Sequence, residues 1–519
     1  MKRIYNTLFI VGFISLFMSS CNDWLDVRPS DEIKEEYLFE TGNGYRTALN
    51  GIYRKLATFD LYGSNLSWGL IDGWGLVYNL DKAPDDGGGR AMKKIATFSF
   101  KHSELTPTTD AMWDAAWNII ANCNNLAQQV ENEDTLLFYD RTHERDMIFA
   151  EAIALRAYMH FDLLRIYAPS LLMNPGERTF IPYVDKYPSY LSDRQTVSYC
   201  LQHIIDDLKK AQSILLSVDK SASFSMESRF IQSYNGESRF LGYRGYRMNY
   251  YAVTAELARV YLYAQKADEA YAEAKKVIDV VESKKWFAAS TSSSGFNKGN
   301  MKMMEDIIFS LYSTDLTDWD QKINHLSDNP ADEYNEHYLC LGDELVNEFF
   351  GSEKSSDWRL IYQLEGKYYD YYYRTLKYNK QKEGTTYSKV NDEMIPMIRM
   401  SEVYYIAAEA IYKTDPALAQ KYLSSVKKGR GIKNVDYSQV TSEEEFINMI
   451  VSDARREFVG EGQTFFMYKR LKKNLLGMEG YSWKEVEAKE ENMVLPLPDS
   501  ESNISVSYTH LTLPTKRIV

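Results

Sequence analysis

The sequence contains few of the residues that build disulfide or metal frameworks. It has 4 Cys and 7 His in 519 residues, and the cysteines lie far apart with no Cys-x-x-Cys pair. His143-Glu144 lacks the second histidine, four residues after the first, that the helix of a zincin requires. Because neither spacing fits a disulfide framework or a zinc site, we predict no metal and no cofactor.

An excess of positive charge is also missing. Asp and Glu number 73 against 60 Lys and Arg, which gives a formal net charge of -13. A protein that follows a phosphate backbone needs the opposite balance, so the composition argues against nucleic acid as a partner. With 45% hydrophobic and 26% charged residues, the chain has the composition of a globular body with a sizeable core.

Linear motifs of the common enzyme classes are absent. The sequence shows no Gly-x-Ser-x-Gly nucleophile elbow, no phosphate-binding loop and no dinucleotide fingerprint. We therefore predict a protein that is not an enzyme. A glycoside hydrolase stays open as an alternative, because its two catalytic carboxylates need no linear signature.

Long apolar runs are limited to the N-terminus. Two basic residues precede an apolar stretch from Leu8 to Met18, which is too short to span a bilayer and fits the hydrophobic region of a secretory signal. Ser19-Ser20 before Cys21 resembles the lipobox of bacterial lipoproteins. We predict a signal peptide over residues 1–20 and lipidation of Cys21, which would anchor the protein to a membrane. Secretion with cleavage elsewhere is the alternative.

Apolar and small residues at three- and four-residue steps predict a mostly helical fold. The segments 45–53 and 112–117 show this pattern. It is clearest from Ala150 to Leu164, where small residues form one face for close packing and Pro169 helps to end the helix.

A repeated helix pair is the strongest architectural signal. Large, small and aromatic residues over 257–277 fall near the offsets of a tetratricopeptide repeat, with the turn at Lys266. A weaker copy covers 406–423 with a turn at Asp415-Pro416, where a fortuitous Ala-rich helix explains the pattern nearly as well. We predict a single mostly α domain over residues 21–505, built as a tetratricopeptide-like scaffold of helix pairs.

Two irregular segments, near 59–101 and 291–391, interrupt this scaffold as long loop insertions. The chain has 40 Tyr and 9 Trp, a surplus of amphipathic rings. A sugar presents an apolar ring face bordered by hydroxyls, so a capture site needs flat aromatic rings next to hydrogen-bonding side chains. The candidate ligand-binding residues are Trp68, Asp72, Trp74, Tyr78, Asn79 and Asp81 in the first insertion, and Trp319, Tyr368 and Tyr371 in the second. The alternative is that these rings attach the loops to the helical core.

Five segments follow one another in the order of one known family. They are Asn22-Asp23-Trp24-Leu25-Asp26 after the lipobox, 151–167, 398–410, 455–462 and Leu495-Pro496-Leu497-Pro498. Together they resemble the SusD/RagB family of outer-membrane nutrient-binding lipoproteins from Bacteroidota. The charged residues on these segments are interpreted as buried ion pairs that orient helices, namely Arg156, Arg165, Arg455, Arg456 and Glu457.

The resemblance implies a SusD-like fold and a surface-exposed lipoprotein of the outer membrane. Such a protein captures oligosaccharides or peptides and delivers them to a TonB-dependent (SusC-like) transporter, without chemistry of its own. A surface glycoside hydrolase and a pure protein-interaction scaffold are the alternatives. The sequence departs from the family over Gln463 to Tyr468, which leaves the pairing of Arg470 open. Residues 506–519 resemble a translated sequencing adapter, and we regard them as non-native.

Overall fold

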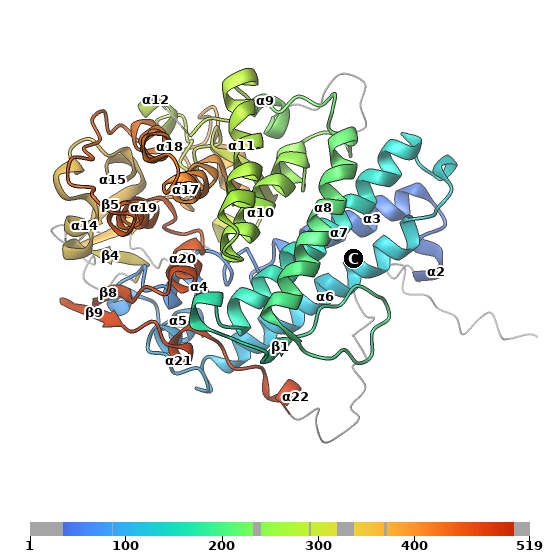
Figure 1. The fold of residues 1–519 in the computed structure, drawn as a ribbon, viewed down its shortest axis with the longest axis horizontal. Coiled ribbons are helices and arrows are strands. Elements are labelled where there is room, and N and C mark those ends of the chain that lie inside the picture. Colours follow the sequence, from blue (N-terminus) through green and yellow to red (C-terminus); the bar gives the residue numbers. More distant parts are fainter. Residues whose placement is uncertain are drawn as a thin grey trace, which may run out of the picture.

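The computed structural model describes residues 35–85, 87–231, 240–289, 292–318, 337–367 and 371–502, and helices dominate them (Figure 1). The helices are α2 (Glu35–Leu38), α3 (Gly42–Leu56), α4 (Leu70–Trp74), α5 (Gly87–Ala96), α6 (Thr106–Val130), α7 (Arg141–Tyr167), α8 (Val197–Val218), α9 (Met226–Phe230), α10 (Tyr250–Tyr263), α11 (Ala267–Lys284), α12 (Ser293–Phe296), α14 (Asp343–Phe350), α15 (Trp358–Gln363), α16 (Ser388–Asp392), α17 (Met400–Ile411), α18 (Pro416–Gly429), α19 (Glu443–Glu457), α20 (Gln463–Leu471), α21 (Glu490–Met493) and α22 (Asp499–Ser502).

The strands are short and all of their pairings are antiparallel. They are β1 (Thr179–Ile181), β2 (Gln195–Thr196), β3 (Ile307–Tyr312), β4 (Cys340–Gly342), β5 (Leu364–Lys367), β6 (Tyr372–Thr375), β7 (Met394–Arg399), β8 (Leu475–Glu479) and β9 (Ser482–Val486). They form the pairs β1–β2, β3–β7 and β8–β9 and the three-stranded order β4–β6–β5. The mostly α fold predicted from periodicity is therefore confirmed.

Helix α7 forms the centre of the molecule, because it packs between α6 and α8. Its residues from Met147 to Tyr167 are all buried, because apolar and small residues surround the helix and its few charged side chains are paired. The backbone leaves the helix at Ala168, directly before Pro169, as predicted. Within the described residues, no helix combines the length and apolar character needed to cross a membrane.

Two helical hairpins extend this layer and confirm the predicted repeat. The first is α10 and α11, the second is α17 and α18, and α11 packs against α17, so the pairs stack side by side. One helix of each hairpin has a strong local start signal: Asn249 accepts from two backbone N–H groups of α10, the first helix of its pair, and Asp415 caps α18, the second helix of its pair, before Pro416. The weaker sequence copy is thus a true helix pair and not a fortuitous Ala-rich helix.

The first insertion is more regular than the sequence suggested. Helices α4 and α5 lie within 59–101, where we expected no helical pattern. Ala91, Met92 and Ile95 give α5 a buried face. A Cβ on Gly89 would lie 1.9 Å from the carbonyl oxygen of Pro84, so glycine at this position permits a close approach of the backbone at the start of α5.

The second insertion is irregular, as predicted, in the parts that the structure describes. It consists of short helices and the β4–β6–β5 sheet, and β3–β7 connects it to the start of α17. The two insertions are joined by backbone hydrogen bonds. The amide of Asn79 donates to the carbonyl of Cys340 (2.7 Å), and that of Tyr338 donates to the carbonyl of Lys82 (2.8 Å).

A buried ionic cluster connects the scaffold to the second insertion. The carboxylate of Glu457 contacts Arg399 (2.6 Å), Arg430 (2.6 Å) and Arg359 (3.1 Å). Burial alone would raise the pKa of Glu457, but the guanidiniums of Arg430 and Arg399 hold it well below the ordinary value. Four charges from four separate segments meet here, so this cluster specifies how those segments pack.

The other charged residues of the family-like helices are also buried. Arg156 forms a bidentate pair with Asp207, Arg165 pairs with Asp162, and Arg456 pairs with Glu353 and Asp357. These contacts confirm the predicted ion pairs. Arg455 differs, because it donates to the carbonyl of Leu476 and lies 3.9 Å above the ring of Phe349.

Candidate functional site: an aromatic surface at the β8–β9 hairpin

The tryptophans of the first insertion lie inside the protein. Trp74 is 0% exposed, stacks on Phe465 at 3.9 Å and donates its indole N–H to the carbonyl of Asn492. Trp68 is 4% exposed and donates to the carbonyl of Gly63. Both rings are used for packing, so the structure corrects their assignment as ligand-stacking groups in favour of the alternative, attachment of the loop to the core.

The polar candidates beside them are used internally too. The carboxyl group of Asp72 accepts from the backbone N–H groups of Gly460 (2.7 Å) and Gly462 (3.0 Å), and burial raises its pKa to about 8. The Tyr78 ring is buried, and the Asn79 side chain donates to the carbonyl of Gly480. Asp72 and Asn79 thus join the first insertion to the C-terminal part of the chain, while the Tyr78 hydroxyl donates to Asp72 (3.4 Å) within the insertion. The structure corrects the assignment of all three residues as well.

Two predicted residues remain exposed, and the fold brings them to one place. Tyr371, from the second insertion, is 47% exposed, and Asp81, from the first, is also exposed. The tip of the β8–β9 hairpin lies between them. A Cβ on Gly480 would lie 3.2 Å from Oδ2 of Asp81, and the ring of Tyr481 lies 6.4 Å from that of Tyr371.

We call the group formed by Asp81, Tyr371, Tyr372 and Tyr481 the aromatic surface. Tyr481 is 65% exposed at the hairpin tip, and its ring is nearly perpendicular (82°) to that of Tyr371. The ring of Tyr372 lies below, 5% exposed and 6.5 Å from Tyr481; burial and the hydrogen bond with Tyr481 raise its pKa. The arrangement presents apolar ring faces next to a carboxylate, as a sugar requires.

Tyr481 and Trp483 were not predicted from the sequence, and Trp483 is 42% exposed on β9. The available signal was Gly480-Tyr481 itself, because glycine in the first central position is typical of a two-residue hairpin turn. Three other predictions cannot be placed, because Cys21, Trp319 and Tyr368 lie outside the described residues.

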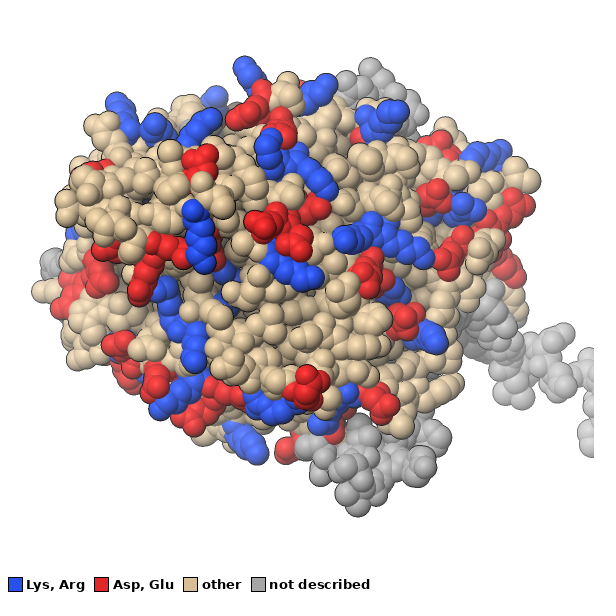
Figure 2. Space-filling model, viewed as in Figure 1, with Lys and Arg blue, Asp and Glu red and all other residues tan. Residues whose placement is uncertain are grey.

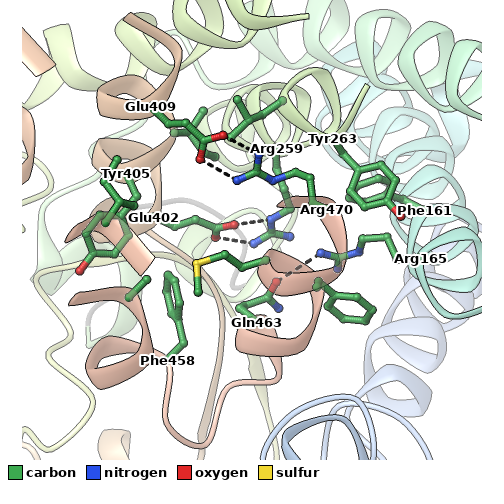
Figure 3. A pocket seen from close by; sticks show the side chains of 16 residues that line it. Phe161, Arg165, Arg259, Tyr263, Glu402, Tyr405, Glu409, Phe458, Gln463 and Arg470 are labelled. Carbon is green, nitrogen blue, oxygen red and sulfur yellow. Dashed lines mark hydrogen bonds and ion pairs between the residues drawn. The ribbon is translucent and has the colours of Figure 1, made fainter. Parts of the chain in front are cut away.

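A second group of charged residues lines a pocket between α7, α10, α17, α19 and α20 (Figure 3). Arg259 pairs with Glu402, and Arg470 pairs with Glu409 through two contacts of 2.6 Å, which answers the question left open for Arg470. The pocket has a volume of ≈ 70 Å³, room for about two waters. It is therefore too small for a sugar, and its ion pairs hold the helices together.

Charge of both signs is spread over the face shown in Figure 2. Basic and acidic side chains alternate there over the helical part of the molecule. On that face, residues of opposite charge are thus interspersed, as on a solvated surface.

Comparison with known proteins identifies the family. Residues 212–501 match the model of the SusD family, and residues 90–233 match one described as starch-binding associating with outer membrane. A SusD-like protein of Formosa agariphila is 23% identical over 234 residues, which cover 43% of this chain and 41% of that protein. The chain thus matches about two fifths of that curated relative.

Solved structures share the fold. A SusD superfamily protein from Bacteroides thetaiotaomicron superposes with a TM-score of 0.64 at 23% identity, over 89% of this chain and 98% of that one. A putative sugar binding protein from Bacteroides vulgatus gives 0.65 at 23% identity, over 89% and 96%. With a family model that matches more than half of its length and this shared fold, the chain belongs to the SusD family.

Proposed function

We propose that this protein captures oligosaccharides at the bacterial outer membrane through its aromatic surface. The observation that carries the proposal is the meeting of Asp81, Tyr371 and Tyr481, which come from three distant segments and are exposed together. Exposed rings beside a carboxylate offer stacking and hydrogen bonding to a sugar. The family description as starch-binding and the sugar-binding title of a structural neighbour support a glycan over a peptide.

The same proposal includes the predicted cellular context. The signal peptide of residues 1–20 would be removed, Cys21 would carry the lipid, and the captured sugar would pass to a TonB-dependent, SusC-like transporter. The description of one matching family as associating with outer membrane supports this location. Capture followed by transfer requires no bond to be broken, so the protein would act as a binding subunit and not as an enzyme.

The test is a titration of the purified protein with a panel of oligosaccharides and peptides, followed by product analysis. Tyr481→Ala should weaken sugar binding by about 1 kcal/mol, roughly fivefold, because it removes one stacking ring. Tyr190→Ala is the matched control, since Tyr190 is 71% exposed on the β1–β2 loop, away from the hairpin.

Equal losses in Tyr481→Ala and Tyr190→Ala would refute the site. Binding of peptides alone would favour the peptide alternative, and release of shortened products would show a hydrolase. Copurification of the transporter with the protein would support the delivery step.

A further inference from the structure

A second concave surface lies beside α21 and the segment that follows α5. It is a trough open to solvent, with a volume of ≈ 1000 Å³. Its lining includes Phe98, Phe100, Lys101, Arg178 and Glu490. Ligand sites usually enclose about 300 to 1,000 Å³, so this trough, unlike the ionic pocket of Figure 3, has room for sugar rings.

The floor of the trough is aromatic and rigidly supported. The half-buried rings of Phe98 and Phe100 lie 6.1 Å apart, nearly perpendicular to each other (73°). Phe100 packs on Trp74 at 5.4 Å, and Trp74 stacks on Phe465 in the core. Because Phe100 rests on this buried column, the half-buried rings of the floor are held in place before a ligand binds.

The backbone of Phe98 is in an unusual conformation. Its φ is 57°, in the left-handed region, and the amide of Ser99 donates to the carbonyl of Lys94. This is the bonding of a Schellman motif, in which glycine is the usual residue at the left-handed position. A phenylalanine there costs on the order of 1 kcal/mol relative to glycine, and its ring joins the floor of the trough.

The walls of the trough supply hydrogen-bonding groups. Arg178 donates to both carboxylate oxygens of Glu490 at 2.8 Å, and this exposed pair borders the trough. Lys101 and His102 are exposed on the opposite segment. Donors and acceptors beside aromatic rings match the alternation of hydroxyls and apolar faces along a sugar chain.

Strand β9 and the residues that follow it lead along the chain from the aromatic surface to the trough. Tyr481 stands at the start of this strand, and Glu490 follows it nine residues later. An extended chain covers at most about 3.3 to 3.6 Å per residue, so these two sites are within roughly 30 Å of each other. A saccharide of several units can therefore reach from one to the other.

From this geometry we propose that the trough is a second saccharide subsite, which binds the distal part of a long glycan held at the aromatic surface. The inference rests on the proposed function. Engagement of a second subsite by the same molecule is intramolecular, so it raises the affinity for long chains and leaves that for short ones unchanged.

The test compares Phe98→Gly with wild type across size series of malto-, cello- and xylooligosaccharides. Glycine readily adopts a φ of 57°, so the variant removes the phenyl ring and favours the backbone conformation that Phe98 has. Lys285→Gly is the matched control, because Lys285 is exposed and holds the same left-handed position after α11, with φ 55°. Melting temperatures of both variants report on folding.

Loss of stacking at Phe98 should weaken binding of the long members roughly two- to tenfold, with no change for the short members or for Lys285→Gly. Equal affinities of wild type and folded Phe98→Gly at every length would overturn the second subsite. Tyr481→Ala separates the two proposals. If Tyr481→Ala weakens the binding of oligosaccharides of every length while Phe98→Gly changes none, only the second subsite is refuted. If Tyr481→Ala itself leaves every affinity unchanged, the aromatic surface is refuted. Absence of binding to every series would overturn both.

Discussion

Replacing Trp74 by alanine tests whether this ring belongs to the core or to a ligand site. The indole is 0% exposed, stacks on Phe465 at 3.9 Å and donates to Asn492 at 2.8 Å. A Trp to Ala change in a core removes burial and leaves a cavity, at a cost of about 3 to 5 kcal/mol. The change also leaves the carbonyl of Asn492 without its donor, which places Trp74→Ala toward the upper part of that range.

Urea denaturation measures this loss as a lower midpoint with an unchanged slope. Trp483→Ala is the control, since this ring is 42% exposed on β9 and its loss should change the free energy of unfolding by less than about 1 kcal/mol. The affinity of the folded fraction for short oligosaccharides, which occupy only the aromatic surface, should be close to that of wild type in the Trp74 variant.

The reasoning would be refuted by the reverse result. If Trp74→Ala unfolded at the wild-type urea concentration but bound short oligosaccharides several times more weakly, the ring would contact ligand, and the packing seen here would not describe the protein in solution. A loss of stability in Trp483→Ala as large as in Trp74→Ala would also contradict the assigned burial.

Two further predictions concern Asp72 and Cys21. Because burial raises the pKa of Asp72 to about 8 in the folded protein, the carboxyl favours folding when protonated, and this contribution is lost as pH rises from about 4 to about 8. As the pH rises through that window, Asp72→Asn should therefore gain stability relative to wild type by up to about 1.4 kcal/mol per pH unit. If the urea midpoints of the two proteins run parallel from pH 5 to 8, the prediction is contradicted. Cys21→Ser should abolish labelling by radioactive palmitate and release the protein from membranes, whereas full membrane retention of an unlabelled variant would exclude lipid as the anchor.

Much of the helical scaffold could be predicted from local sequence. The small residues of α7, the cap at Asp415 and the paired patterns of α10–α11 and α17–α18 each act over a few turns, so their periodicity is visible without a structure. The buried arginines could be expected because they stand on otherwise apolar helices, where a charge needs a partner. Helix α5 was missed, since its glycine-rich start resembles a turn.

The accessibility of the aromatic residues was decided only by the tertiary structure. Trp74 and Tyr371 are both aromatic residues in irregular segments, yet one is buried by α20 and the other is exposed. The burial of a ring depends on segments hundreds of residues away, and the residues next to the ring in the sequence do not indicate which segments these are.

The same reason explains the candidate site. Its formation requires the backbone bond between Asn79 and Cys340 and the contact of Gly480 with Asp81. The sequence by itself determined that the chain forms stacked helix pairs, because helical periodicity is a local property. Only long-range packing determined which rings meet at the surface, because each of those contacts joins parts of the chain that have no pattern in common.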